Sequence, residues 1–113
     1  MTPIEKNVVS DSEIYFYKAS ERAQELFFDP LCIGRYHCDA GYRVIRDCYD
    51  SFLVIYVEEG EGYIRTQEEA VGLRCGEFAL LDCYRAHEYG TDSGWKILWM
   101  HFDCMMGSCY FLV

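Results

Sequence analysis

A chain of 113 residues has room for one domain with a core, and a composition that is 51% hydrophobic and 17% aromatic excludes a disordered segment. No apolar run approaches the roughly 20 residues that span a bilayer, and the first residues lack the basic and apolar stretches of a secretory signal, so we expect a cytoplasmic protein without a membrane partner. The net charge of −9 repels a phosphate backbone, so we expect no direct nucleic acid binding by these residues.

The first part of the chain contains one predicted helical segment, at residues 20–28. Ser20 can cap its amino end, and Ala23, Leu26 and Phe27 share one face. We interpret residues 1–30 as a lead-in arm.

Short segments rich in Val, Ile, Tyr, Phe and Trp follow, separated by glycines at short intervals. The most apolar of them enters a Glu-Gly-Glu-Gly sequence at residues 59–62, which we interpret as a turn between two strands. The expected strands, in chain order, are residues 31–38, 42–46, 52–58, 63–66, 70–74, 77–81, 86–89 and 95–102. About eight evenly spaced strands with at most a short helix predict an all-β jelly-roll barrel.

The last segment, residues 105–113, is apolar and does not end in a polar tail. Because a domain boundary usually falls in an exposed polar segment, we expect the sequence to be truncated, with a further C-terminal part after residue 113.

Seven cysteines are spread along the chain, an odd and high number. Without a secretory signal we expect them as reduced thiols that act as small buried hydrophobic side chains. A zinc site is disfavoured because there is no C-x-x-C, and only Cys104 and Cys109 approach the spacing of a ligand pair. We expect no metal and no cofactor.

Four motifs occur in a consistent order between residues 31 and 102. The sequence YDSFLVIYVEEGEG at 49–62 resembles the strand and G-x-G turn that open the sensor barrel of AraC-type bacterial transcription regulators. GEFALLD at 76–82, HEYG at 87–90 and WKILWMHF at 95–102 are similar to that family's Gly-Asp strand opening, H-x-Y-G element and W-x-x-x-W-x-x-F strand.

The resemblance implies a single cupin-like effector-binding domain (a double-stranded β-helix) over residues 1–113, with its barrel at 31–102. Full-length regulators of this family continue into a helix-turn-helix DNA-binding domain, which is absent here. The partner it implies is a small-molecule effector held in the barrel lumen, and a homodimer is compatible with it.

The resemblance also indicates which residues line the ligand. Arabinose-binding members use an Arg before the G-x-G strand, the His and Tyr of H-x-Y, and a Trp on the last strand. The matching positions are Arg46 (allowing a one-residue gap), His87, Tyr89 and Trp99. The family's arabinose pocket also has a His two residues before that Trp, where this chain has Ile97, which argues against arabinose itself.

Strand geometry supports the same site independently, because side chains alternate between the two faces of a strand. His87 and Tyr89 therefore share a face, and so do Trp99 and His101. An indole stacks on the C–H face of a sugar while Arg, His and Tyr bond its hydroxyls, so we expect a sugar effector and no enzymatic activity. The competing interpretation is that these are core side chains, with Arg46 at the rim paired to Asp47 or Asp50.

A metal-dependent cupin enzyme acting on a small molecule is the alternative function. It needs two or three His and a carboxylate around one metal, but residues 52–62 contain no His, and His37, His87 and His101 are scattered. A third interpretation is a purely structural dimerisation module, which a ligand bound in the lumen would exclude.

Overall fold

The computed structural model describes residues 5–9, 11–16 and 29–103, and all the regular structure in them is β. The strands are β1 (Glu13–Phe16), β2 (Asp29–Cys38), β3 (Arg43–Arg46), β4 (Phe52–Thr66), β5 (Ala70–Arg74), β6 (Phe78–Asp82), β7 (His87–Gly90) and β8 (Trp95–Asp103). The predicted all-β class is confirmed. The predicted helix at 20–28 lies outside the described residues. Among the residues described, no helix is long and apolar enough to cross a membrane.

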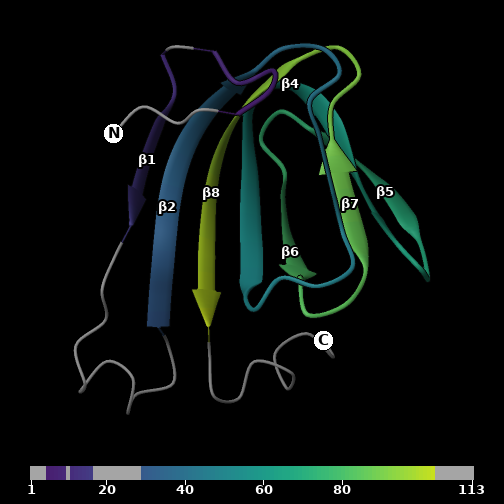
Figure 1. The fold of residues 1–113 in the computed structure, drawn as a ribbon. Helices are drawn as coiled ribbons and strands as arrows, with labels where there is room; N and C mark the ends of the chain where they lie inside the picture. Colours follow the sequence, from purple (N-terminus) through teal and green to yellow (C-terminus); the bar gives the residue numbers. More distant parts are fainter. Residues whose placement is uncertain (1–4, 10, 17–28, 104–113) are drawn as a thin grey trace.

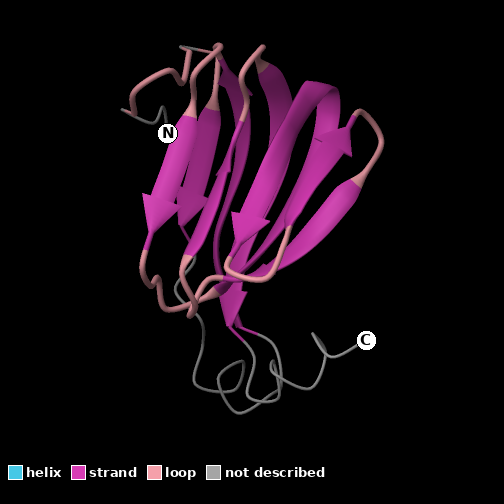
Figure 2. Cartoon of the chain, turned by 90° about the vertical axis from the view of Figure 1, so that its right-hand side faces the viewer, coloured by secondary structure: helices cyan, strands magenta, loops and turns pink. Residues whose placement is uncertain are grey.

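Two antiparallel sheets share one strand, β4. The first sheet has the order β1-β2-β8-β4-β6, and the second has the order β3-β7-β4-β5. Figure 1 shows β1, β2 and β8 on one side of β4 and β7 and β5 on the other. Seen from the side in Figure 2, the strands curl so that one face of each sheet turns inward.

The predicted turn at residues 59–62 is wrong, because β4 runs through it as one continuous strand. Its first part pairs with β6 and β8, and its last part pairs with β5 and β7. The pairing register with β8 shifts between Val57 and Glu59, and Gly60 takes a φ of +81°. A bulge with a glycine bends a strand sharply. The bend at Gly60 therefore lets β4 pass from one sheet into the other instead of turning back in a hairpin.

Two further differences from the prediction concern the chain before the barrel. The expected lead-in contributes a strand, β1, which pairs with β2 from Glu13↔Arg35 to Phe16↔Cys32. β2 itself begins at Asp29, two residues before the predicted start. A four-residue strand is too short for the alternation of polar and apolar residues to be recognised in a sequence. Whether it forms depends on the strand with which it pairs.

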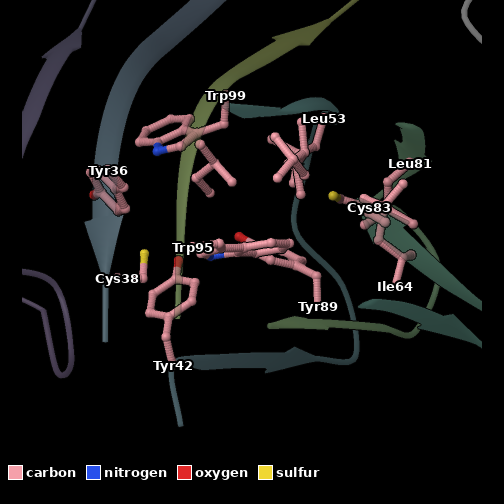
Figure 3. Packing of buried hydrophobic residues seen from close by; sticks show 14 of the residues in the cluster. Tyr36, Cys38, Tyr42, Leu53, Ile64, Leu81, Cys83, Tyr89, Trp95 and Trp99 are labelled. Carbon is pink, nitrogen blue, oxygen red and sulfur yellow. The ribbon is translucent and has the colours of Figure 1, made fainter. Parts of the chain in front are cut away.

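The core lies between the two sheets and follows the alternation of β4 and β8. Leu53, Ile55 and Val57 of β4 are almost fully buried. The predicted common face of Trp99 and His101 is confirmed, since both side chains are buried, as are Trp95 and Ile97 earlier on the same strand. Figure 3 shows the aromatic side chains of this core converging from β2, β8 and the strands opposite. Each fully buried aliphatic side chain contributes about 1.5–3 kcal/mol to the stability of the fold.

Position 62 requires glycine because the Trp95 ring and the Gly90 carbonyl leave no space for a side chain. A Cβ at this position would be 2.2 Å from the Trp95 ring and 2.4 Å from the carbonyl oxygen of Gly90. Gly72, on the neighbouring strand β5, has no atom within 4 Å of such a Cβ.

Gly62→Ala is therefore expected to destabilise the fold by about 1–3 kcal/mol, the usual cost of overpacking a core. Gly72→Ala, as the matched control, should stay within about 0.5 kcal/mol of the parent. Urea denaturation of the two variants measures the difference, and equal stabilities would contradict the role given to Gly62.

Candidate functional site

A cavity of about 180 Å³ lies on the inner side of the curled sheets. Strands β1, β2, β3, β4, β7 and β8 all contribute to its wall. The lining residues are Glu5, Ile14, Phe16, Cys32, Tyr36, Tyr42, Arg46, Tyr49, Leu53, Tyr89, Trp99 and His101.

The structure brings three of the four predicted site residues to this cavity: Arg46, Tyr89 and Trp99. His87 is not among the lining residues. It is buried beside Tyr89, with ring centroids 6.2 Å apart and nearly parallel planes, and its Nδ1 lies 2.8 Å from the carbonyl oxygen of Arg85. Ligand binding by these four side chains stays a prediction.

Trp99 lies against β2 at a point where that strand has no side chain. A Cβ at Gly34 would be 2.4 Å from the indole ring, so glycine is what allows the ring to lie there. The ring of Tyr36 meets the indole edge-on, with ring centroids 5.0 Å apart. Figure 3 shows the two side chains next to each other. The indole Nε1 is buried and has no hydrogen-bond partner among the described residues.

Arg46 is held over an aromatic ring and is not paired with an acidic side chain. Its guanidinium lies 4.3 Å from the ring centroid of Tyr49, a cation–π contact. Its Nη1 is buried without a hydrogen-bond partner in the described part of the chain. The ion pairs found among residues 5–9, 11–16 and 29–103 do not include Arg46, so the pairing with Asp47 or Asp50 considered above is not present.

His101 belongs to the cavity although it was not among the predicted site residues. Its Nδ1 shares a hydrogen bond with Ser51 Oγ at 2.7 Å, and its ring lies 5.4 Å from Trp99 and 4.7 Å from Tyr49. Burial, then the charges of Arg46 and His87, lower the pKa of His101 to about 4. The imidazole is therefore neutral at pH 7.

The hydroxyls of Tyr36, Tyr42 and Tyr89 are also neutral. Burial is the main cause that raises the pKa of Tyr36, Tyr42 and Tyr89, and the neighbouring Glu5 carboxylate raises that of Tyr36 further. The formally charged side chains in the wall are thus Arg46 and Glu5.

Sequence reasoning missed Tyr36, Tyr49 and His101. Alternation indicates two of them, because His101 lies two residues after Trp99, and Tyr36 lies on the strand that pairs with β8. Tyr49 lies between β3 and β4, outside any strand, so no periodicity marks it.

Metal ligands do not gather in the described residues, where no three His, Cys, Asp or Glu side chains are grouped so as to hold an ion. His37 lies on β2 in contact with Asp11.

The five described cysteines are unpaired. Cys32, Cys38 and Cys83 are buried as expected, whereas Cys48 and Cys75 are exposed, against expectation.

Comparison with known proteins gives a family and a fold. The profile of the AraC-like ligand binding domain family matches residues 30–106. The MmsAB operon regulatory protein of Pseudomonas aeruginosa is 31% identical over 78 residues, which are 64% of this chain and 25% of that protein. The chain therefore spans about a quarter of the length of this curated relative.

Solved structures with low sequence identity share the fold. A predicted oxalate decarboxylase from Thermotoga maritima matches with a TM-score of 0.60 at 14% identity, over 83% of this chain and 81% of that one. Ectoine synthase from P. lautus matches with a TM-score of 0.62 at 18% identity, over 89% and 67%. A cupin-2 domain containing protein from Shewanella frigidimarina matches with a TM-score of 0.54 at 15% identity, over 78% of each chain. These likenesses confirm the cupin-like fold.

The low pKa of His101 makes stability depend on pH in a defined window. The unfolded histidine titrates near 6.5 and the folded one near 4, so between these values the unfolded chain binds more protons. This contribution to stability is present above pH 6.5 and is lost as the pH falls toward 4, by up to about 1.4 kcal/mol per pH unit.

His101→Gln removes the titrating ring but keeps a polar partner for Ser51. The variant should show a shallower fall in unfolding free energy between pH 6.5 and 4.5, measured by urea denaturation. An unchanged pH dependence would show that His101 is not buried as a neutral ring.

Proposed function

This chain belongs to the AraC-like ligand binding domain family, and we propose that it senses a small-molecule effector for a transcription regulator by binding it in the cavity between the two sheets. The observation that carries the proposal is the presence of unpartnered N–H groups of Arg46 and Trp99 in the described wall of a cavity of about 180 Å³.

Such groups carry an energetic cost in the protein on its own. A buried donor without an acceptor destabilises a fold by about 1–3 kcal/mol, and native proteins contain few of them. A ligand that supplies acceptors at Arg46 and Trp99 removes that cost, so the wall favours an occupied cavity.

We further propose that the effector is of the sugar type. The indole of Trp99 offers an apolar face for sugar C–H groups, and Tyr36 and Tyr89 offer neutral hydroxyls for hydrogen bonds. Aromatic walls with a few polar groups are the usual composition of small-ligand sites.

The positive charge of Arg46 near His87 and His101 supports a sensor more than a metal-dependent enzyme. Arg46 lies directly opposite His87 in the register of β3 and β7, and its charge contributes to the low pKa of His101 after the effect of burial. The same positive potential would oppose a divalent cation between these histidines.

DNA binding by a regulator of this kind is proposed to reside outside these 113 residues. The net charge of −9 makes this chain repel a phosphate backbone, and the regulatory relative is about four times as long as the matched segment.

The proposal is tested by a thermal-shift screen of neutral pentoses and hexoses, followed by calorimetry on the sugar that stabilises most. A ligand present at a hundredfold excess over its Kd should stabilise the chain by about 2.7 kcal/mol. Trp99→Phe keeps an apolar ring but has a smaller stacking surface, so the binding free energy should weaken by about 0.5–1.5 kcal/mol.

Trp95→Phe is the matched control, because Trp95 is equally buried on the same strand but does not line the cavity. It should lower the melting temperature without changing affinity. If Trp99→Phe behaves in the same way as this control, Trp99 is a core residue and the effector binds elsewhere.

A further inference from the structure

The positive charge of Arg46 is not neutralised within the described residues, unlike that of its neighbours. Arg43 on the same strand contacts Glu88 at 3.5 Å and Asp92 at 3.6 Å, and Arg65 contacts Glu88 at 3.6 Å. The side chains of Arg43 and Arg65 are about half exposed, whereas Arg46 lines the cavity with Nη1 buried. Water screens the exposed charges, whereas an anionic partner would stabilise the half-buried guanidinium of Arg46, whose Nη1 is shielded from water.

The unpartnered groups of the cavity-lining residues indicate the kind of ligand group that fits them. Arg46 Nη1 and Trp99 Nε1 can only donate hydrogen bonds, and neither has an acceptor among the described residues. A hydroxyl brings a proton as well as lone pairs, whereas a carboxylate only accepts and can take two donors at once. The chemistry of this wall therefore fits a carboxylate better than a neutral hydroxyl.

The opposite charge, that of Glu5, acts on a different set of side chains. Burial raises the pKa of Tyr36, Tyr42 and Cys38, and Glu5 adds to each rise. Arg46 instead lowers the pKa of His101 and counteracts the effect of burial on Cys32 and Cys83. Both charges affect Tyr89, whose pKa is raised by burial, lowered by Arg46 and raised by Glu5.

The cavity wall thus offers two chemically different kinds of partner. Arg46 offers donors for an acceptor, and Glu5 offers a carboxylate beside the Tyr36 hydroxyl, which suits ligand hydroxyl groups. Its volume of about 180 Å³ slightly exceeds the roughly 150 Å³ of an engineered cavity that admits benzene. A compact ligand of a few carbon atoms matches this space.

We propose that the effector is a small hydroxy acid, bound with its carboxylate on Arg46 and Trp99 and its hydroxyl groups toward Tyr36 and Glu5. This inference rests on the proposed function and specifies the class of effector that the cavity takes.

The test compares alditols with the aldonates that differ from them only by a carboxylate in place of a terminal CH₂OH. The pairs are glycerol and glycerate, D-arabitol and D-arabinonate, and D-glucitol and D-gluconate, with D-arabinose and D-glucose as neutral sugars. Calorimetry with the full chain should give at least about tenfold tighter binding for the aldonate of the best-fitting pair, because charge-assisted hydrogen bonds are the stronger ones.

Arg46→Gln should remove most of that preference, and Arg46→Lys, which keeps the charge, should retain part of it. Arg43→Gln is the matched control, since it makes the same change in net charge on the same strand outside the cavity. It should leave the preference unchanged. If Arg46→Gln does not fold, the comparison of Arg46→Lys with the parent decides.

Three results would overturn the inference. If alditols or neutral sugars bind as tightly as the aldonates, the cavity does not recognise a carboxylate, but the proposed function as an effector sensor still holds. An aldonate preference that Arg46→Gln does not reduce would place the carboxylate elsewhere. If neither the sugars nor the acids bind, the sugar-type effector of the proposed function fails together with the hydroxy acid.

Discussion

The passage of β4 from one sheet into the other is the constraint on which the rest of the structure depends. The bend is possible because Gly60 takes a positive φ, and Gly62 leaves space for the Trp95 ring against the strand. Since both sheets contain β4, their inner faces are brought toward each other and enclose the cavity. A hairpin turn at the same place would leave two sheets without this common strand.

Enclosure then determines the electrostatics of the cavity. Burial raises the pKa of the Tyr36, Tyr42 and Tyr89 hydroxyls and keeps His101 neutral, so these groups serve as hydrogen-bond partners without charge. Arg46 stays charged because a guanidinium does not lose its proton in proteins. The result is a mostly aromatic wall with one cation, Arg46, and one carboxylate, Glu5. Such an arrangement mainly determines the orientation of a ligand.

Much of this was predictable from the sequence, for reasons that can be traced to particular residues. Alternation in WKILWMHF placed Trp99 on the inner face, and the order of the motifs indicated the cupin-like sensor fold. The bend of β4 was not predictable, because a Gly-x-Gly sequence reads equally as a turn and as a bulge, and only the partners of the strand decide. The position of His87 behind Tyr89 and the approach of Tyr49 to Arg46 also depend on tertiary packing.

The most direct test of the account follows the indole N–H groups by nuclear magnetic resonance. The chain contains two tryptophans, so a ¹⁵N-labelled sample gives two indole signals, which Trp95→Phe assigns. Saturation with the tightest-binding compound of the sugar and aldonate series should shift the Trp99 signal, as its Nε1–H gains an acceptor, and leave that of Trp95 nearly unchanged. A Trp99 signal that does not move at saturation would contradict the claim that the effector binds in this cavity.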